Sequence, residues 1–158
     1  MKISKITKAN FYLKYFIFIK IPLIWLCKPK IINLNSEYIE IKINLNRKTK
    51  NHLNTMYFGV LSVGADITGG FLAMLCIKES KKKVSLIFKD YKANFLRRAE
   101  GDVHFICKQG KEISELVNKT IQSDNRENML LYIEAFVPSI SNDIIAKFEL
   151  TLSLRKYI

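Results

Sequence analysis

Cysteine and histidine are scarce in this sequence, and their positions exclude several kinds of site. The three cysteines, Cys27, Cys76 and Cys107, form no C-x-x-C pair, and their odd number and wide spacing fit neither a zinc site nor a disulfide framework. The two histidines, His52 and His104, fall in different predicted elements, which leaves little for a Cys–His catalytic pair or a metal centre. We therefore expect reduced thiols in a cytoplasmic protein, with no metal and no bound cofactor.

The chain also lacks the short motifs of several large protein classes. It has no glycine-rich nucleotide loop, and Ser62 lacks the G-x-S-x-G setting of a hydrolase nucleophile. A net charge of +12 favours anionic partners, but neither an aromatic-basic RNA motif nor zinc-finger spacing accompanies it. Because the lysines are scattered through every segment, with the densest cluster only at Lys81–Lys83, we expect no nucleic-acid partner.

The apolar segment near the N-terminus is too interrupted to cross a bilayer. Its longest uncharged run is Ile21–Cys27, against about 18 residues for a membrane-spanning helix. Lysines break the apolar core and no small-x-small cleavage site follows, so we expect no signal peptide. We predict a helical extension over residues 1–29, with a helix at Asn10–Ile19 that covers a hydrophobic surface and with Pro22 and Pro29 marking its exit. Docking of this segment on a membrane surface is the less favoured alternative.

The remainder of the chain is rich in predicted strands. Its 158 residues, of which 49% are hydrophobic and 25% charged, are typical of one globular domain. Alternating apolar and polar side chains predict strands over residues 36–46, 81–96, 101–109, 129–137 and 142–156. Apolar residues at helical spacing predict a short amphipathic helix over residues 111–122. Residues 71–79 are expected to lead into a short buried strand.

Residues 51–70 contain a single charged side chain, Asp66, in an otherwise apolar run with several glycines. The run is too long and too rich in small residues for one strand, so we predict a helix over residues 57–72. A helix that is apolar nearly all round must be covered on most sides, and an antiparallel sheet curled around it achieves this. The sequence thus predicts an α+β fold.

Small residues surround the carboxylate when this helix is projected at 3.6 residues per turn. The residues on the face of Asp66 are Gly59, Ser62, Val63, Gly69 and Gly70. Glycine in a helix interior costs about 1 kcal/mol relative to alanine, so this clustering requires a reason. Either another part of the fold packs closely against this face, or a ligand approaches it.

One motif in this region resembles that of a known family. The pattern N-x5-Y-F-G-x6-D, formed by Asn51, Tyr57, Phe58, Gly59 and Asp66, resembles the signature of hotdog-fold acyl-CoA thioesterases of the PaaI-like type. That signature reads Asn, five residues, His-Gly-Gly at the start of the central helix, and an acidic residue seven positions after the second glycine. Here Tyr57 replaces the histidine and Phe58 replaces the first glycine.

Other segments extend the resemblance over nearly the whole chain. Residues 19–25, 91–103 and 145–156 resemble segments of a little-characterised bacterial branch of the same superfamily. The resemblance implies a hotdog fold, in which the sheet wraps the central helix, here with an extra N-terminal helix. It also implies a homodimer or a homotetramer, with active sites built across the interface between two chains.

The resemblance also implies roles for individual residues. Asp66 from the partner's helix would activate water as a general base or attack the carbonyl directly, and Asn51 would orient the water or the carbonyl. Backbone N–H groups near Phe58 and Gly59 would stabilise the oxyanion at the helix N-terminus. Tyr57 would donate a hydrogen bond in place of the histidine or form a wall of the acyl pocket.

Five further residues are candidates for substrate binding. Ser62 and Val63 lie on the face of the acidic residue, and His52 is either a pocket residue or an exposed loop histidine. Arg97 and Arg98 end a predicted strand, and their planar guanidinium groups suit the phosphates of coenzyme A. The alternative is a solvated strand end in which these arginines pair with Glu100 or Asp102.

Three functions remain open from the sequence. The first is hydrolysis of an acyl-CoA or related acyl thioester, in which coenzyme A enters only as part of the substrate. The second is a non-catalytic acyl-CoA-binding or lipid-binding protein, which the loss of the histidine and of one glycine makes credible. The third is a structural oligomer without a ligand.

Overall fold

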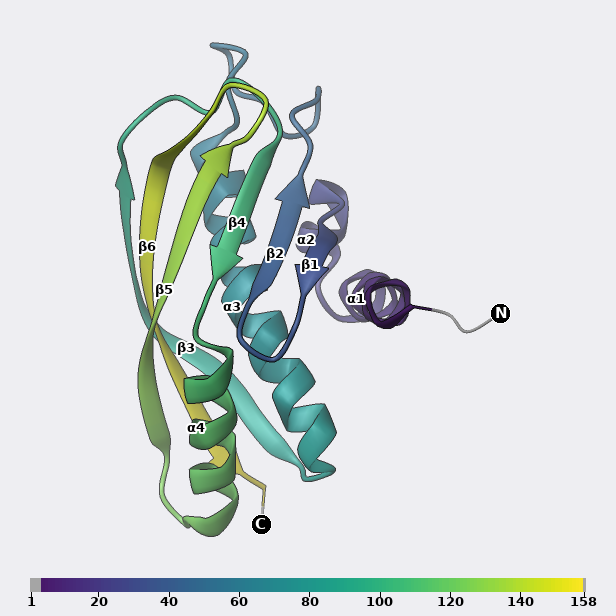
Figure 1. Ribbon diagram of the computed structural model, residues 1–158, viewed down its shortest axis with the longest axis vertical. Helices are drawn as coiled ribbons and strands as arrows, with labels where there is room; N and C mark the ends of the chain where they lie inside the picture. Colours follow the sequence, from purple (N-terminus) through teal and green to yellow (C-terminus); the bar gives the residue numbers. More distant parts are fainter. Residues whose placement is uncertain (1–3, 158) are drawn as a thin grey trace.

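The structure, a computed structural model describing residues 4–157, is built on one antiparallel sheet that curls around a long helix (Figure 1). The strands are β1 (Lys30–Leu34), β2 (Ile39–Ile43), β3 (Val84–Phe95), β4 (Val103–Cys107), β5 (Glu127–Val137) and β6 (Ser141–Lys156). Their order across the sheet is β1-β2-β4-β5-β6-β3. This is the predicted hotdog architecture. The strands expected from alternation are confirmed, whereas β1 was missed.

The central helix, α3 (Phe58–Ser80), is longer than predicted. Tyr57 caps it rather than joining it, and the helix continues through residues 71–79, so the predicted end at residue 72 and the predicted short strand were wrong. Most of these later residues favour helix, and side chains of β5 and β3 pack against Gly69 and Gly70. By length and hydropathy α3 could span a bilayer, but in the fold it is largely buried as the core helix.

Two glycines of α3 show why its sequence is rich in small residues. A Cβ atom at Gly64 would collide with the ring of Phe105 on β4. A Cβ atom at Gly69 would lie 2.9 Å from Leu131 on β5, which is too close for a real contact. At these two positions close packing against the sheet explains the glycine, and for Gly69, which lies on the face of Asp66, this is one of the two alternatives left open by the sequence.

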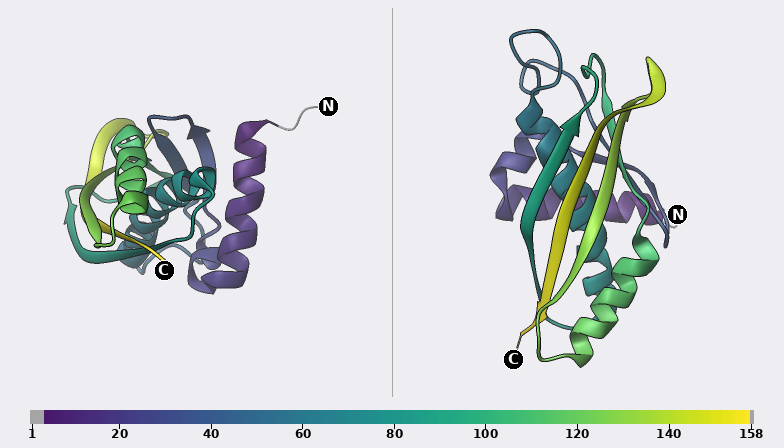
Figure 2. Two further views of the ribbon diagram at one scale, coloured as in Figure 1. Left: turned by 90° about the horizontal axis from the view of Figure 1, so that it is seen from below. Right: turned by 90° about the vertical axis from the view of Figure 1, so that its left-hand side faces the viewer.

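The N-terminal segment forms two helices, α1 (Lys5–Lys20) and α2 (Pro22–Cys27). The first begins five residues before the predicted Asn10, because the Ser4 side chain accepts a hydrogen bond from the N–H of Thr7 and caps the helix. Figure 2 shows α1 lying outside the sheet and α3, next to β1. The Asn10 side chain joins the two elements: its Nδ2 donates to the carbonyl of Ile31 at 2.9 Å, and its Oδ1 accepts from the N–H of Ile31 at 2.8 Å.

The opposite edge of the sheet is formed by β3, which within residues 4–157 pairs with β6 alone. Three large apolar side chains on this strand, Ile87, Tyr91 and Phe95, are 42–47% exposed. A bulge between Phe88 and Tyr91 interrupts the pairing with β6. The last helix, α4 (Gly110–Gln122), packs against α3, β5 and β6, as its predicted amphipathic face requires. The long β3 edge therefore remains uncovered in one chain.

Candidate active site

The N-terminus of α3 presents free backbone donors. The Tyr57 carbonyl accepts from the N–H groups of Val60 and Leu61 at 2.9 and 3.1 Å, so the helix ladder begins there. Within residues 4–157, the N–H groups of Phe58 and Gly59 donate to no protein acceptor. Unpaired donors at the positive end of the helix dipole favour an anion or a developing oxyanion.

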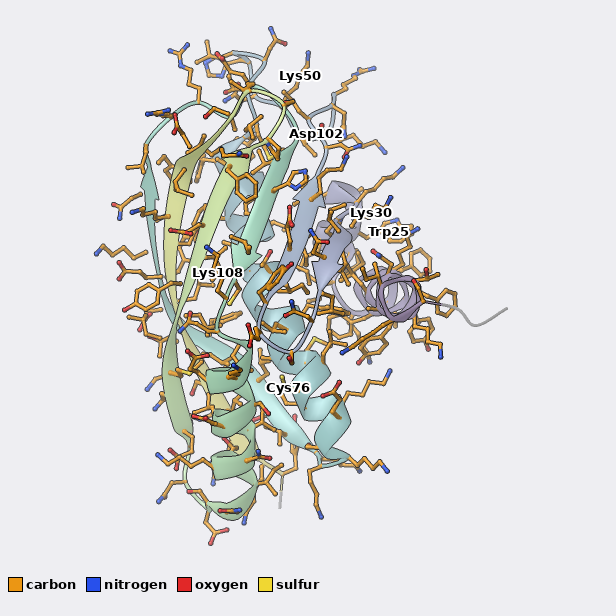
Figure 3. All side chains as sticks on the ribbon, in the orientation of Figure 1. Trp25, Lys30, Lys50, Cys76, Asp102 and Lys108 are labelled. Atoms are coloured by element: carbon orange, nitrogen blue, oxygen red, sulfur yellow. The ribbon has the colours of Figure 1, made fainter. Side chains whose placement is uncertain are left out.

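A cavity of about 550 Å³ opens beside this helix end. Its lining includes six residues predicted for the site, namely Asn51, His52, Tyr57, Phe58, Arg97 and Arg98. Figure 3 labels Lys50 and Asp102 at this end of the molecule, one next to each of the two segments that supply the lining. Thr55, Met56, Leu61, Phe95, Leu96 and Ala99 complete the wall. The structure thus brings together residues separated by more than forty positions in sequence.

Asn51 organises the loop that precedes α3. Its carboxamide oxygen accepts from the N–H groups of Leu53 and Thr55 at 2.9 and 3.2 Å, and its Nδ2 donates to the Thr55 hydroxyl at 3.0 Å. Met56, at the end of this loop, donates its N–H to the carbonyl of Ala99 at 2.8 Å. Asn51 therefore shapes the cavity wall, and the second hydrogen of its amide is the group left for a substrate or water.

The two arginines at the cavity differ in their partners. Arg97 forms an ion pair with Asp143 on β6, whereas Arg98 has no ion pair in the described part of the chain. The predicted alternative partners were wrong, because Asp102 instead accepts from Lys42 at 3.1 Å and from the N–H of Leu45 at 2.9 Å. Arg98 is thus the arginine whose charge is available at the cavity.

The aromatic rings at the helix start narrow the approach to the donors. The Tyr57 ring lies against Gly59, where a Cβ atom would come within 2.5 Å of the ring. It meets Phe58 edge to face with the ring centroids 4.8 Å apart, and Phe58 in turn lies 6.3 Å from Phe95. Tyr57 and Phe58 remain 47% and 58% exposed. A side chain at Gly59 would therefore displace the ring of Tyr57, and Phe58 offers an apolar surface at the mouth of the cavity.

Asp66 lies away from the cavity of its own chain. It follows Phe58 by eight positions, which corresponds to about 12 Å along the helix axis. Burial raises the pKa of this carboxyl, and no charged or hydrogen-bonding group among the described residues lowers it. Burying an ionised carboxylate that has no ion-pair or hydrogen-bond partner lowers the stability of the fold. The presence of Asp66 here therefore favours a role in catalysis or binding over a purely structural role.

The neighbours of Asp66 lie on α3 and β3. Ser62 donates to the carbonyl of Phe58 at 3.1 Å, and Gly70 leaves room beside the carboxylate. Tyr91 of β3 belongs to this cluster: burial raises the pKa of its hydroxyl, a hydrogen bond with Ser62 opposes that shift, and the charge of Asp66 adds to it. Tyr91 was not predicted, because only the pairing of β3 with β6 brings it beside the helix.

The remaining reactive side chains belong to other parts of the fold. His104 pairs with Glu40 at 2.6 Å on the sheet, far in sequence from His52. Burial raises the pKa of Cys107 to about 11, and burial together with Glu79 raises that of Cys76 to about 11. Thiols with such values are protonated at neutral pH and weakly nucleophilic. Among the residues of known placement, no three His, Cys, Asp or Glu side chains gather as a metal site.

Comparison with protein families gives a match over residues 10–151 to the model of a family described as a domain of unknown function, DUF4442. The chain belongs to this family. No curated protein sequence matches it. The DUF4442 match begins within α1 and ends within β6, and it includes the whole candidate site.

Solved structures similar to this DUF4442 chain share its fold. A protein with unknown function from Chlorobaculum tepidum superposes with a TM-score of 0.83 at 13% identity, covering 96% of this chain and 97% of its own. A probable thioesterase from Pseudomonas aeruginosa superposes with a TM-score of 0.77 at 18% identity, with 99% of both chains covered. A thioesterase from Haemophilus influenzae gives 0.70 at 17% identity, covering 98% of this chain and 93% of its own. At these identities the similarity establishes the hotdog fold.

Proposed function

We propose that this protein hydrolyses an acyl-CoA or a related acyl thioester, and that it does so as a homo-oligomer. The observation that carries the proposal is the pair of N–H groups of Phe58 and Gly59, which have no acceptor within residues 4–157 and lie at the positive end of α3, where Phe58 lines the cavity. Such donors stabilise the oxyanion of acyl transfer. The fold shared with thioesterases supports the same reaction class.

The position of Asp66 requires two chains for one site. A carboxylate about 12 Å along the helix from the oxyanion donors cannot reach a carbonyl bound at those donors. Two copies that join edge to edge through β3 in antiparallel fashion would place their α3 helices side by side and head to tail. The Asp66 of one chain then lies opposite the helix N-terminus of its partner. The uncovered apolar side chains of β3 support this mode of association.

The reaction follows from these groups. The thioester carbonyl oxygen accepts from the N–H groups of Phe58 and Gly59, which stabilise the negative charge that forms there. The partner's Asp66 removes a proton from the attacking water, or attacks the carbonyl carbon itself to give an anhydride that water then hydrolyses. In both routes the C–S bond breaks and the thiolate leaves. The Asn51 amide hydrogen can orient the water or carbonyl.

The cavity also supports the substrate class. Phe95, Leu96 and Leu61 provide an apolar wall, and the unpaired guanidinium of Arg98 lies at the same cavity. An anionic carrier such as coenzyme A would place its phosphates beside Arg98 while the acyl group contacts the aromatic rings.

The test is thioester hydrolysis by the purified protein across acyl-CoA substrates of increasing chain length, with Asp66→Ala and Asp66→Asn beside the wild type. We expect both variants to lose turnover while folding normally. Asp124→Asn, which alters a fully exposed carboxylate, serves as the matched control and should keep full activity. Turnover that is unchanged in Asp66→Asn would remove the catalytic assignment.

A second candidate function is binding of acyl-CoA without hydrolysis. The specific observation in its favour is that the rings of Tyr57 and Phe58 stand at the helix start, where the related motif has His-Gly. Calorimetric titration with a non-hydrolysable acyl-CoA thioether distinguishes the two functions. Micromolar binding without turnover of any thioester in the substrate series would favour the binding protein.

A further inference from the structure

The N-terminal helices expose an apolar surface that the proposed active site does not use. On α1, Phe11, Tyr15 and Phe18 recur at helical spacing and are 75%, 60% and 61% exposed. The N-terminal apolar face is defined by these three residues together with Ile19 of α1 and Leu23 and Leu26 of α2, which are 50–64% exposed. Contiguous apolar patches of more than a few hundred Å² mark interaction surfaces.

This face is held firmly by the rest of the fold. The opposite side of α1 is buried in the core through Ala9, Leu13 and Ile17. The paired hydrogen bonds between Asn10 and Ile31 fix the helix against β1. The helix is therefore apolar on two opposite sides, and the core of one chain covers only one of them. The exposed rings are thus presented outward by a docked helix.

The positive charge of the N-terminal segment indicates what kind of surface would bind the N-terminal apolar face. Seven lysines and no aspartate or glutamate precede Glu37 in the sequence. Lys14 and Lys20 lie exposed on α1 among the apolar residues. Figure 3 places Trp25 and Lys30 on this same side of the molecule, away from β3. A second copy of this face would bring two basic surfaces together, whereas an anionic surface would neutralise the lysines.

We propose that the N-terminal apolar face docks on an anionic lipid membrane, with α1 lying in the plane of the interface. Aromatic and leucine side chains would enter the boundary between headgroups and acyl chains, and the lysines would contact lipid phosphates. The 16 residues of α1 extend only about 24 Å, less than the thickness of the hydrocarbon core, so the helix lies on the membrane and does not cross it. This proposal does not depend on the proposed hydrolysis.

The test uses the full chain with vesicles of phosphatidylcholine alone and of phosphatidylcholine mixed with phosphatidylglycerol. Trp25 is the only tryptophan, and its ring lies 5.1 Å from that of Phe18, so its fluorescence reports on this face. We expect co-sedimentation with the mixed vesicles and a shift of the emission to shorter wavelength. Both should weaken as salt rises from about 0.05 M to about 0.5 M.

Matched variants assign the effect to the face. The double variant Phe11→Ser and Phe18→Ser should lose binding to the vesicles. The control double variant Leu53→Ser and Ile140→Ser changes exposed apolar residues outside this face and should keep that binding. Lys14→Glu with Lys20→Glu should weaken binding to the mixed vesicles, and a single change of exposed Lys48 to Glu should not.

Three results would overturn the proposal. The first is wild-type protein that binds neither vesicle, and the second is an equal loss of binding in the control variants. The third is a wild-type protein that does not bind vesicles, together with a Phe11→Ser and Phe18→Ser double variant whose mass by sedimentation is lower than that of the wild type. That result would assign the face to contact with a second copy of the chain.

Discussion

Phe58→Pro removes one oxyanion donor of α3 and little else from the backbone. Phe58 is the first residue of the helix, where proline is well tolerated because the N–H there has no helical acceptor. Tyr57, with φ −63° and ψ 135°, already has the conformation that a residue before proline prefers. The variant should therefore fold, and Phe58→Ala, which removes the ring but keeps the N–H, is its matched control.

The expected magnitude follows from the number of donors. Loss of one of two oxyanion donors costs about 2.7–4 kcal/mol of transition-state stabilisation, so kcat/KM of Phe58→Pro should fall about 10²–10³-fold below that of Phe58→Ala. The assay is steady-state hydrolysis of the best acyl-CoA substrate, with melting curves to show equal folding. Equal kcat/KM for the two variants would refute the assignment of the helix start as an oxyanion site.

Mixing variants tests whether one site needs two chains. In a heterodimer of Phe58→Pro and Asp66→Asn chains, one site carries both changes and the other carries neither. Random pairing of the two inactive variants should thus restore about a quarter of the wild-type activity. No recovery on co-refolding would show that the carboxylate and the donors do not meet across an interface.

Three further results are expected. Because burial raises the folded-state pKa of Asp66, the free energy of unfolding of the wild type should fall as pH rises through that pKa, and Asp66→Asn should melt at a higher temperature than wild type at neutral pH. The kcat/KM of the wild type should rise over the same pH range, and a flat pH profile of kcat/KM would exclude Asp66 as the base. Arg98→Ala should raise KM for acyl-CoA more than Arg97→Ala does, since Asp143 already neutralises Arg97; an equal rise with a phosphate-free thioester would exclude phosphate contact. Asn10→Ala should lower the unfolding free energy by about 1–3 kcal/mol in urea titration, and an unchanged midpoint would show that its bonds to Ile31 contribute nothing.

The spacing of apolar residues along the chain predicted most of the fold, because each helix or strand buries one side and that burial leaves a regular apolar pattern in its sequence. The alternation in β6 correctly identified its buried apolar residues, Ala146 to Leu154 at every second position, although Ser153 on the polar side is also buried. The end of α3 was mispredicted because residues 71–79, which are mostly apolar, were expected to lead into a short buried strand, whereas in the fold they continue the helix. The five-residue strand β1 has no clear alternation and depends on pairing with β2.

The candidate site was predicted to the extent that its residues are neighbours in sequence. Residues of the segment from Asn51 to Phe58 form one wall of the cavity. Long-range partners were not visible: the ion pair of Arg97 with Asp143 and the approach of Tyr91 to Ser62 both depend on the pairing of β3 with β6. Sequence spacing indicates which side chains share an element, but not which other element faces them.

The two edges of the sheet are unequal, and this limits how many copies can assemble. At the β1 edge, the Asn10 carboxamide occupies both hydrogen-bonding groups of Ile31 that an incoming strand would need. At the β3 edge, the backbone has a neighbour on one side only. A protein with two open edges can add copies without end and form fibres, whereas one open edge is used up when two copies meet. In the proposed pairing through β3, this single amide side chain on α1 would thus keep edge-to-edge growth of the sheet from continuing beyond two copies.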